Sequence, residues 1–287
     1  MITHVAEAGE NKGRVVVVSA RGHPRTGALD AAVMIARAFG AAIEALIVEN
    51  GEVRDLAHYP FARAVSIATG VVTVLAPAVS AADQSMLALA ARRAIERHVV
   101  AAGIGIVSNI VNTESIAALV QTCRRCGPWN VIVLADPAAQ LQLELLDAAR
   151  SRELPATALV LAPPTAPRPE GAVVVVVEDA EQAPQMLRTA ERLAAVDGRG
   201  VELFLLAPDL DRLNLLDAQL RLMIGAGPMP AIHAAQPSRG VRAAAIEALR
   251  RRAPRLVVMT DTSLLAEDPA SLAELPAVLA CPLLVTR

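Results

Sequence analysis

The chain alternates between short β-branched runs and longer segments in which apolar residues recur at helical spacing. Continuous valine runs in Arg14–Ser19 and Ala172–Glu178 predict strands buried on both faces, since a half-exposed strand would alternate apolar and polar residues. Thr26–Phe39 places its apolar side chains on one face of a helix, and Gly40 follows where a C-cap glycine belongs. Helices between buried strands imply parallel sheets covered on both faces.

The same order of elements is expected in both halves of the chain. The expected strands are Arg14–Ser19, Ala42–Val48, Ile104–Asn109, Asn130–Ala135 and Ala156–Leu161, then Ala172–Glu178, Val201–Leu206, Pro230–Ala235, Arg255–Thr260 and Pro282–Thr286. The expected helices are Thr26–Phe39, Gln84–Ala101, Glu114–Cys126 and Ala138–Arg152, then Glu181–Val196, Leu210–Ile224, Arg239–Arg252 and Pro269–Leu279.

The spacing of corresponding residues indicates a duplication. Val15 and Val173 are 173 − 15 = 158 residues apart, and the second strands repeat at the same distance. Later elements repeat at a shorter distance, because Val131 and Leu256 are 256 − 131 = 125 residues apart. The first half therefore carries 158 − 125 = 33 extra residues, which fall at about 49–83.

A proline-rich stretch separates the two halves. Four of the ten residues in 162–171 are proline, which sustains neither a strand ladder nor a helix interior. We therefore divide the chain into an N-terminal tail (1–13), a first domain (14–161), a linker (162–171) and a second domain (172–287). Each domain is expected to form a separate five-stranded parallel sheet with helices on both faces.

Tandem repeats of this kind resemble the universal stress protein family. Thr26–Glu49 is similar to the family's first helix, glycine turn and second strand. Asn130–Leu161 and Arg255–Thr286 resemble its fourth strand, final helix and closing strand, and Cys281–Val285 (CPLLV) is similar to its closing motif. The resemblance implies two Rossmann-like α/β domains in a bacterial protein of the stress response.

The resemblance also implies where ATP would bind. ATP-binding members carry G-x-x-G, nine further residues and G-[ST] after the fourth strand, so that backbone amides approach the phosphates closely. The corresponding stretches here, 135–140 and 260–265, contain no glycine. Each has an aspartate instead, Asp136 or Asp261, whose charge would repel phosphate.

The family's first strand ends in an aspartate that contacts the nucleotide. The first half has Ser19 at this place, whereas the second half keeps two acids, Glu178 and Asp179. These two acids remain ligand-binding candidates, but without a phosphate loop we expect neither ATP nor AMP as a cofactor.

One loop of the first half has the composition of an anion site. It follows the first strand, at the sheet edge where α/β proteins bind ligands, and precedes a helix N-terminus. Its candidate residues are Arg21, Gly22, His23, Arg25 and Thr26. A solvated turn explains the same composition, and we favour that interpretation.

Cys123 and Cys126 form a C-x-x-C motif. A redox pair is activated at a helix N-terminus, whereas this pair ends a predicted helix. A structural zinc site needs two further ligands, and the sequence has no second C-x-x-C or H-x-x-x-H. We therefore expect two partly buried helix residues and no metal.

The extra segment of the first half is the strongest candidate for an interaction surface. It has no charged residue from Ala64 to Ala82, close to the ~20 residues of a membrane span, but Ser, Thr, Gly and Pro dilute its hydropathy. We expect no transmembrane helix and place the contact with a partner protein or a second copy within Tyr59–Ala82. Packing of this segment against its own domain is the alternative. The apolar candidates are Val71, Val72, Val74 and Leu75.

Composition limits the remaining functions. The chain has 27 basic and 29 acidic residues and only 2% aromatics, which argues against binding of nucleic acid by charge or stacking. Three cysteines and a polar N-terminus favour a cytoplasmic protein. We expect a non-enzymatic module that binds a partner. The alternatives are a nucleotide or small-anion sensor using the cleft between the halves, and a hydrolase of the nucleotide-hydrolase-like fold.

Overall fold

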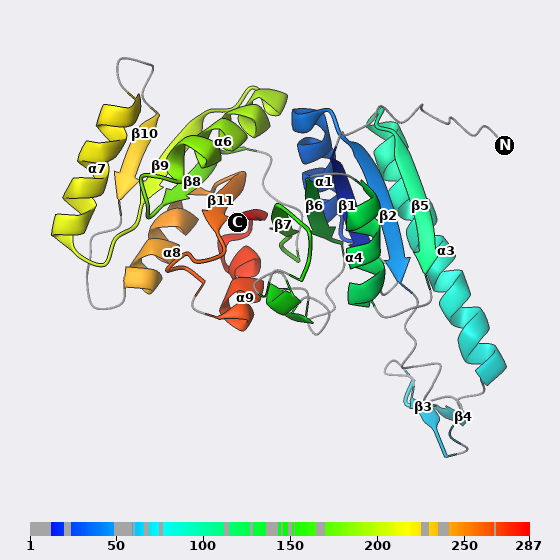
Figure 1. Ribbon diagram of the computed structural model, residues 1–287. Helices are drawn as coiled ribbons and strands as arrows, with labels where there is room; N and C mark the ends of the chain where they lie inside the picture. The colour runs from blue at the N-terminus through cyan, green and yellow to red at the C-terminus, as the bar shows by residue number, and fades with distance from the viewer. Residues whose placement is uncertain are drawn as a thin grey trace.

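Ten strands form one continuous sheet with helices on both of its faces (Figure 1). The computed structural model describes residues 13–19, 24–48, 59, 61–65, 69–74, 77–111, 115–126, 129–135, 143–144, 146–148, 151, 153–164, 170–224, 230–234, 241–266 and 268–287.

Each half contributes five parallel strands, as predicted. In sheet order, the first half has β5 (Ile106–Val111), β2 (Ala42–Val48), β1 (Arg14–Ser19), β6 (Asn130–Leu134) and β7 (Ala158–Leu161). In the same order, the second half has β10 (Ala231–Ala234), β9 (Val201–Leu205), β8 (Val173–Val177), β11 (Leu256–Thr260) and β12 (Leu283–Thr286).

The strand register repeats between the halves. Val15 of β1 lies beside Ile43 of β2, and Val173 of β8 lies beside Val201 of β9. These are the residues that the sequence repeat equates. The two halves are thus built on one strand plan, with β1 and β8 at the centre of their respective sets.

The prediction of two separate sheets is wrong, because β7 and β12 pair with each other in antiparallel orientation. Leu161 lies opposite Leu283 and Leu159 opposite Val285. Both strands would otherwise be apolar sheet edges with unpaired backbone groups, and their pairing removes both edges. The ten strands therefore form one mixed sheet with a single antiparallel seam.

Two apolar layers cover the sheet, one on each face. Alternate valines of β1 point to opposite faces, so Val15 and Val17 enter one layer and Val16 and Val18 enter the other. The first layer holds helices α1 (Thr26–Phe39), α3 (Pro77–Ala101), α6 (Ala183–Asp197) and α7 (Leu210–Ile224). The second layer holds α4 (Ser115–Cys126), α8 (Val241–Arg252) and α9 (Pro269–Leu279).

Glycines end the first helix of each half. Gly40 follows α1 with φ +60° and Gly198 follows α6 with φ +64°, and only a residue without Cβ adopts this left-handed conformation at little cost. The prediction of a C-cap at Gly40 is confirmed. Of the helix expected at 138–152, the structure describes residues 143–144 and 146–148, which are helical, and residue 151, which lies in a turn.

The extra segment of the first half contains a small hairpin and the start of a long helix. Strands β3 (Arg63–Val65) and β4 (Val72–Val74) pair in antiparallel orientation. Helix α3 begins at Pro77 rather than at the expected Gln84, since proline is well tolerated in a first helical turn. Figure 1 shows the hairpin beside the N-terminal end of α3, away from the large sheet. Among the described helices, none has the length and apolarity needed to cross a membrane.

Candidate functional site

The end of β8 places Glu178 against the loop that follows β11. Its carboxylate accepts hydrogen bonds from the backbone N–H of Leu264, at 3.1 Å to Oε1 and 2.9 Å to Oε2. The hydroxyl of Ser263 donates to Oε1 of the same carboxylate. A loop at this edge of the sheet is where an α/β protein presents amides to a phosphate. Here those donors are directed at a side chain of the chain itself.

Burial raises the pKa of Glu178, while the hydrogen bonds from Ser263 and Leu264 act in the opposite direction. Asp179, the second predicted acid, accepts a hydrogen bond of 3.0 Å from the backbone N–H of Glu181. Both acids border a cavity of about 130 Å³ that Thr260 and Thr262 also line. This volume is well below the ~300–1,000 Å³ of typical ligand pockets.

The predicted anion loop of the first half is described only at its end. The side chain of Arg25 donates to the carbonyl of Ala162 at 3.3 Å, and its backbone N–H donates to the carbonyl of Ala135 at 2.6 Å. Thr26 is exposed at the start of α1. Arg25 thus ties the loop to the ends of β6 and β7. The candidates Arg21, Gly22 and His23 lie outside the described residues.

The C-x-x-C motif ends helix α4, as predicted, and both thiols are buried and free. Burial raises the pKa of Cys123 and of Cys126 to about 12 in each case, so both remain protonated near neutral pH. The described part of the chain contains no group of three His, Cys, Asp or Glu side chains placed to hold a metal ion. Cys126 instead donates its thiol proton to Oε2 of Glu44, with 2.9 Å between the heavy atoms.

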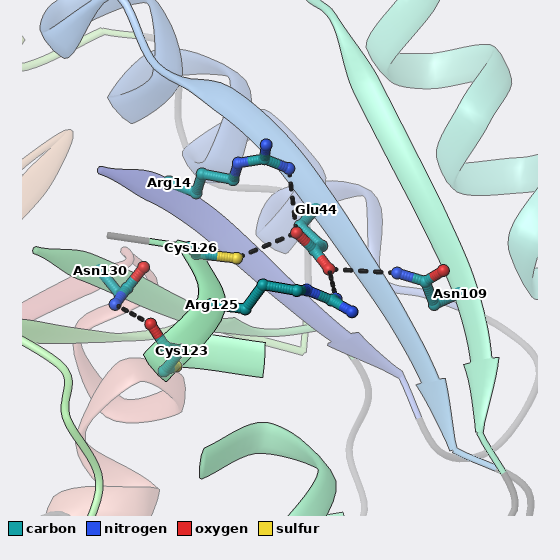
Figure 2. A network of polar contacts seen from close by, with 7 residues as sticks. All are labelled: Arg14, Glu44, Asn109, Cys123, Arg125, Cys126 and Asn130. Carbon is teal, nitrogen blue, oxygen red and sulfur yellow. Dashed lines mark hydrogen bonds and ion pairs between the residues drawn. The ribbon is translucent and has the colours of Figure 1, made fainter. Parts of the chain in front are cut away.

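Glu44 is the centre of a buried polar network (Figure 2). It lies on β2 with 1% of its surface exposed. Arg14 on β1 donates to Oε2 at 3.0 Å, and Asn109 on β5 donates to Oε1 at 3.1 Å. Arg125 at the end of α4 forms an ion pair with Oε1. Three strands and a helix end are thus held by one carboxylate.

The second half contains a counterpart of this network. Glu202 occupies the register position on β9 that Glu44 occupies on β2, and His233 on β10 corresponds to Asn109. Arg252, at the end of α8, approaches Glu202 to 3.6 Å and Nδ1 of His233 to 2.7 Å.

Sequence reasoning identified neither Glu44 nor Glu202 as a residue of a polar network. The signal was present, because each is a single acid inside a strand that is otherwise apolar, and the repeat places both at the same position.

The predicted interface residues are exposed. Val71, Val72 and Val74 have 56%, 60% and 64% of their surface exposed, so these three do not pack into their own domain. Tyr59 and Phe61 lie nearby in sequence, with ring centroids 5.6 Å apart, and are also exposed. The fourth predicted residue, Leu75, lies outside the described residues. We call the described part of 59–74, together with the first described residues of α3 up to Leu87, the arm.

The strand order and the helices on both faces define a tandem α/β protein of Rossmann-like type. The sequence matches no family model and no curated protein. Solved structures show that the fold is that of universal stress proteins. One of these, from Archaeoglobus fulgidus, superposes with a TM-score of 0.58 at 10% identity, covering 95% of this chain and 98% of that one.

Two further structures share the fold. A Pseudomonas aeruginosa protein assigned to the universal stress family has a TM-score of 0.54 at 13% identity, covering 96% of this chain and 93% of its own. The cytoplasmic domain of a prokaryotic cation chloride cotransporter has a TM-score of 0.50 at 10% identity. The match covers 96% of this chain and 95% of that domain's chain. At these identities the likeness concerns the fold alone.

Proposed function

We propose that this is a non-enzymatic regulatory protein of the cytoplasm that acts by binding a macromolecular partner through the arm. The observation that carries the proposal is the exposure of the arm's large apolar side chains, from 46% at Leu87 to 75% at Phe61. Exposed apolar groups that gather on one projecting element usually mark an interaction surface. The resemblance to universal stress proteins suggests a role in a stress response.

The contacts of Glu178 support a function without ATP. The amide of Leu264 and the hydroxyl of Ser263 lie in the loop after β11, where the fold would present donors to a phosphate, and both already donate to this carboxylate. A nucleotide would have to displace Glu178 and approach its negative charge, along with that of Asp179. The small cavity beside these residues adds a steric obstacle.

The fold is compatible with such a role. It serves as the cytoplasmic domain of a cation chloride cotransporter as well as in universal stress proteins. A fold alone implies no activity, so the proposal depends on the arm rather than on the likeness.

The partner test uses an arm variant, Val65→Ser/Val72→Ser/Val74→Ser. The matched control is Leu210→Ser/Leu215→Ser/Leu222→Ser, which removes three exposed leucines from α7 in the second half. Tagged wild type and both variants are each used to capture proteins from a lysate of the native cells. The lysate also contains an untagged copy of this chain. We expect the arm variant to lose captured proteins that the control retains. Equal capture by all three would refute partner binding through the arm.

The ATP test is isothermal calorimetry on the purified chain. We expect no binding heat for ATP or AMP with wild type. Glu178→Ala frees the amide of Leu264 and removes the charge, so any gain of nucleotide binding in this variant would identify Glu178 as the blocking group. Micromolar ATP affinity in wild type would contradict the proposal.

A further inference from the structure

A cavity of about 320 Å³ opens between α6 and α7 in the second half. Leu203 of β9 and Leu220 of α7, each 1% exposed, form its base, and Leu187 and Ile224 line its sides. The volume falls within the ~300–1,000 Å³ of typical ligand pockets, which are likewise lined mostly by apolar side chains. Figure 1 shows α7 at the opposite end of the molecule from the β3–β4 hairpin, so this cavity is separate from the arm.

In the first half an ion pair joins the two helices at the corresponding place. Helix α1 packs on α3, and Nε2 of His98 lies 2.9 Å from Oδ1 of Asp30. The repeat equates Asp30 with Arg188, since 188 − 30 = 158. It equates His98 with Met223, since 223 − 98 = 125, a distance at which the buried residues of the two helices also repeat. The second half thus replaces both members of the pair, and the neutral side chain of Met223 leaves α6 and α7 without this ion pair.

Two opposite charges lie at the mouth of the cavity. Arg188 and Glu191 both line it, are exposed, and are three residues apart on α6. Glu191 replaces Val33, which is buried in the first half, since 191 − 33 = 158. Among the described residues, neither charged side chain has an ion pair or hydrogen bond, with the other or with a third group. A guanidinium and a carboxylate are therefore both available where an apolar space opens to solvent.

We propose that this cavity binds a free α-amino acid with an apolar side chain. The apolar side chain fills the space above Leu203 and Leu220. The α-carboxylate accepts hydrogen bonds from Arg188, and the α-ammonium group donates to Glu191. Side chains three residues apart on a helix have Cβ atoms ~5–6 Å apart, so two long side chains reach the two charges on one carbon atom.

The pair of charges selects this ligand class over simpler ones. A carboxylic acid without an amine would bring its negative charge close to Glu191, and an amine without a carboxylate would bring its positive charge close to Arg188. A zwitterion is attracted by both groups. The inference goes beyond the proposed function, because it concerns a second site and does not depend on the arm.

The ligand test uses saturation-transfer NMR and isothermal calorimetry on the purified full chain. Leucine, methionine and phenylalanine should bind with a Kd of about 1 mM or tighter. Glycine lacks the apolar side chain, isocaproate lacks the ammonium group of leucine, and leucinamide lacks its carboxylate. Each should bind at least about tenfold more weakly than leucine, because each loses one of the three sets of contacts.

The variant test restores the ion pair of the first half. Arg188→Asp/Met223→His introduces the residues that join α1 to α3, so it should close the cavity and weaken leucine binding at least about tenfold in a chain that circular dichroism shows to be folded. Arg188→Gln should weaken the binding of leucine but not that of leucinamide, which has no carboxylate to lose. The matched control, Arg251→Gln, removes an exposed arginine from α8 and should bind leucine like wild type.

Wild type that binds none of the three amino acids overturns the proposal. Leucine binding that Arg188→Asp/Met223→His leaves unchanged also overturns it. So does isocaproate binding as tight as that of leucine, which would assign the cavity to a simple carboxylate. The capture of a partner through the arm is measured with different variants, so its failure and the failure of this ligand site are separate results.

Discussion

Two carboxylates, one buried (Glu44) and one half-buried (Glu178), act as fixed acceptors for parts of the chain that are distant in sequence. Glu178 receives the amide and hydroxyl of the loop after β11, and Glu44 receives donors from β1, β5 and α4. Removing a carboxylate from water is expensive unless such donors satisfy it. Each residue thus fixes a local arrangement of elements.

Glu178 is expected to give the protein a specific pH dependence. Burial raises its pKa, so the native state keeps this proton at pH values where the unfolded chain has lost it. The contribution of Glu178 to the free energy of unfolding is therefore greatest at low pH and falls as pH rises through its raised pKa. The free energy of unfolding of wild type minus that of Glu178→Gln should therefore decrease from about pH 4 towards neutrality. Urea titrations at several pH values measure it.

The amide variant separates charge from hydrogen bonding. Glu178→Gln keeps a carbonyl oxygen for the amide of Leu264, whereas Glu178→Ala leaves that amide and Ser263 without this acceptor and should cost ~1–3 kcal/mol. A difference between wild type and Glu178→Gln that grows with pH would show that the hydrogen bonds, and not burial, set the pKa.

Ala280 is a residue where a single substitution should stabilise the protein. It ends α9 with φ +53°, in the left-handed region that favours glycine. Ala280→Gly should raise the free energy of unfolding by up to ~1 kcal/mol because it relieves this strain. The control, Ala277→Gly, places glycine at an exposed position inside α9 and should lower it by ~1 kcal/mol. Two effects of the same sign in denaturant titrations would contradict the argument.

At the scale of elements, the Glu44 network fixes the end of α4 on the sheet. Glu44→Ala leaves Arg14, Asn109 and Cys126 without their common acceptor in a buried site, and should cost ~3–5 kcal/mol of folding free energy. The same change at Glu202 should cost ~1 kcal/mol or less, because its side chain is 27% exposed and its contacts are longer. Chemical denaturation of the two variants measures both losses of folding free energy. Equal losses would show that the burial of the carboxylate does not determine the size of the loss.

The sequence predicted elements well where a single pattern, a continuous apolar run or a helical spacing of apolar residues, determines the structure. The valine runs of β1 and β8 have no stable place except between two helical layers. The helices expected at Leu210–Ile224 and Pro269–Leu279 match α7 and α9 at both ends. It did not predict the β3–β4 hairpin, because strands of three residues on the surface have no buried face to impose a period.

The candidate site was predicted only in part. Glu178 was named through its place after the first strand of the second half. Its partner Ser263 lies far along the chain, and only the pairing of β8 with β11 brings the two together. The Glu44 network depends in the same way on three strands meeting, which spacing along the chain does not reveal.

At the scale of the whole molecule, the seam turns two repeats into one unit. Both apolar layers contain residues from the two halves, and α1 packs on α6 across the seam. Arg192 of α6 lies 5.7 Å from the ring centroid of Phe39 on α1, which in turn packs against Trp129. Neither half retains a complete core without the other, so the halves are expected to unfold together.

The single tryptophan makes this cooperativity measurable. Trp129 reports on the first half by fluorescence, whereas far-ultraviolet circular dichroism reports on both. The two denaturation curves should coincide, as they do for a two-state transition. Leu249→Ala, a cavity in α8 of the second half, should lower the free energy of unfolding by ~2–5 kcal/mol and move the Trp129 curve by the same amount as the dichroism curve. A Trp129 midpoint that stays in place while the dichroism splits into two steps would mean that the seam joins two independently stable domains.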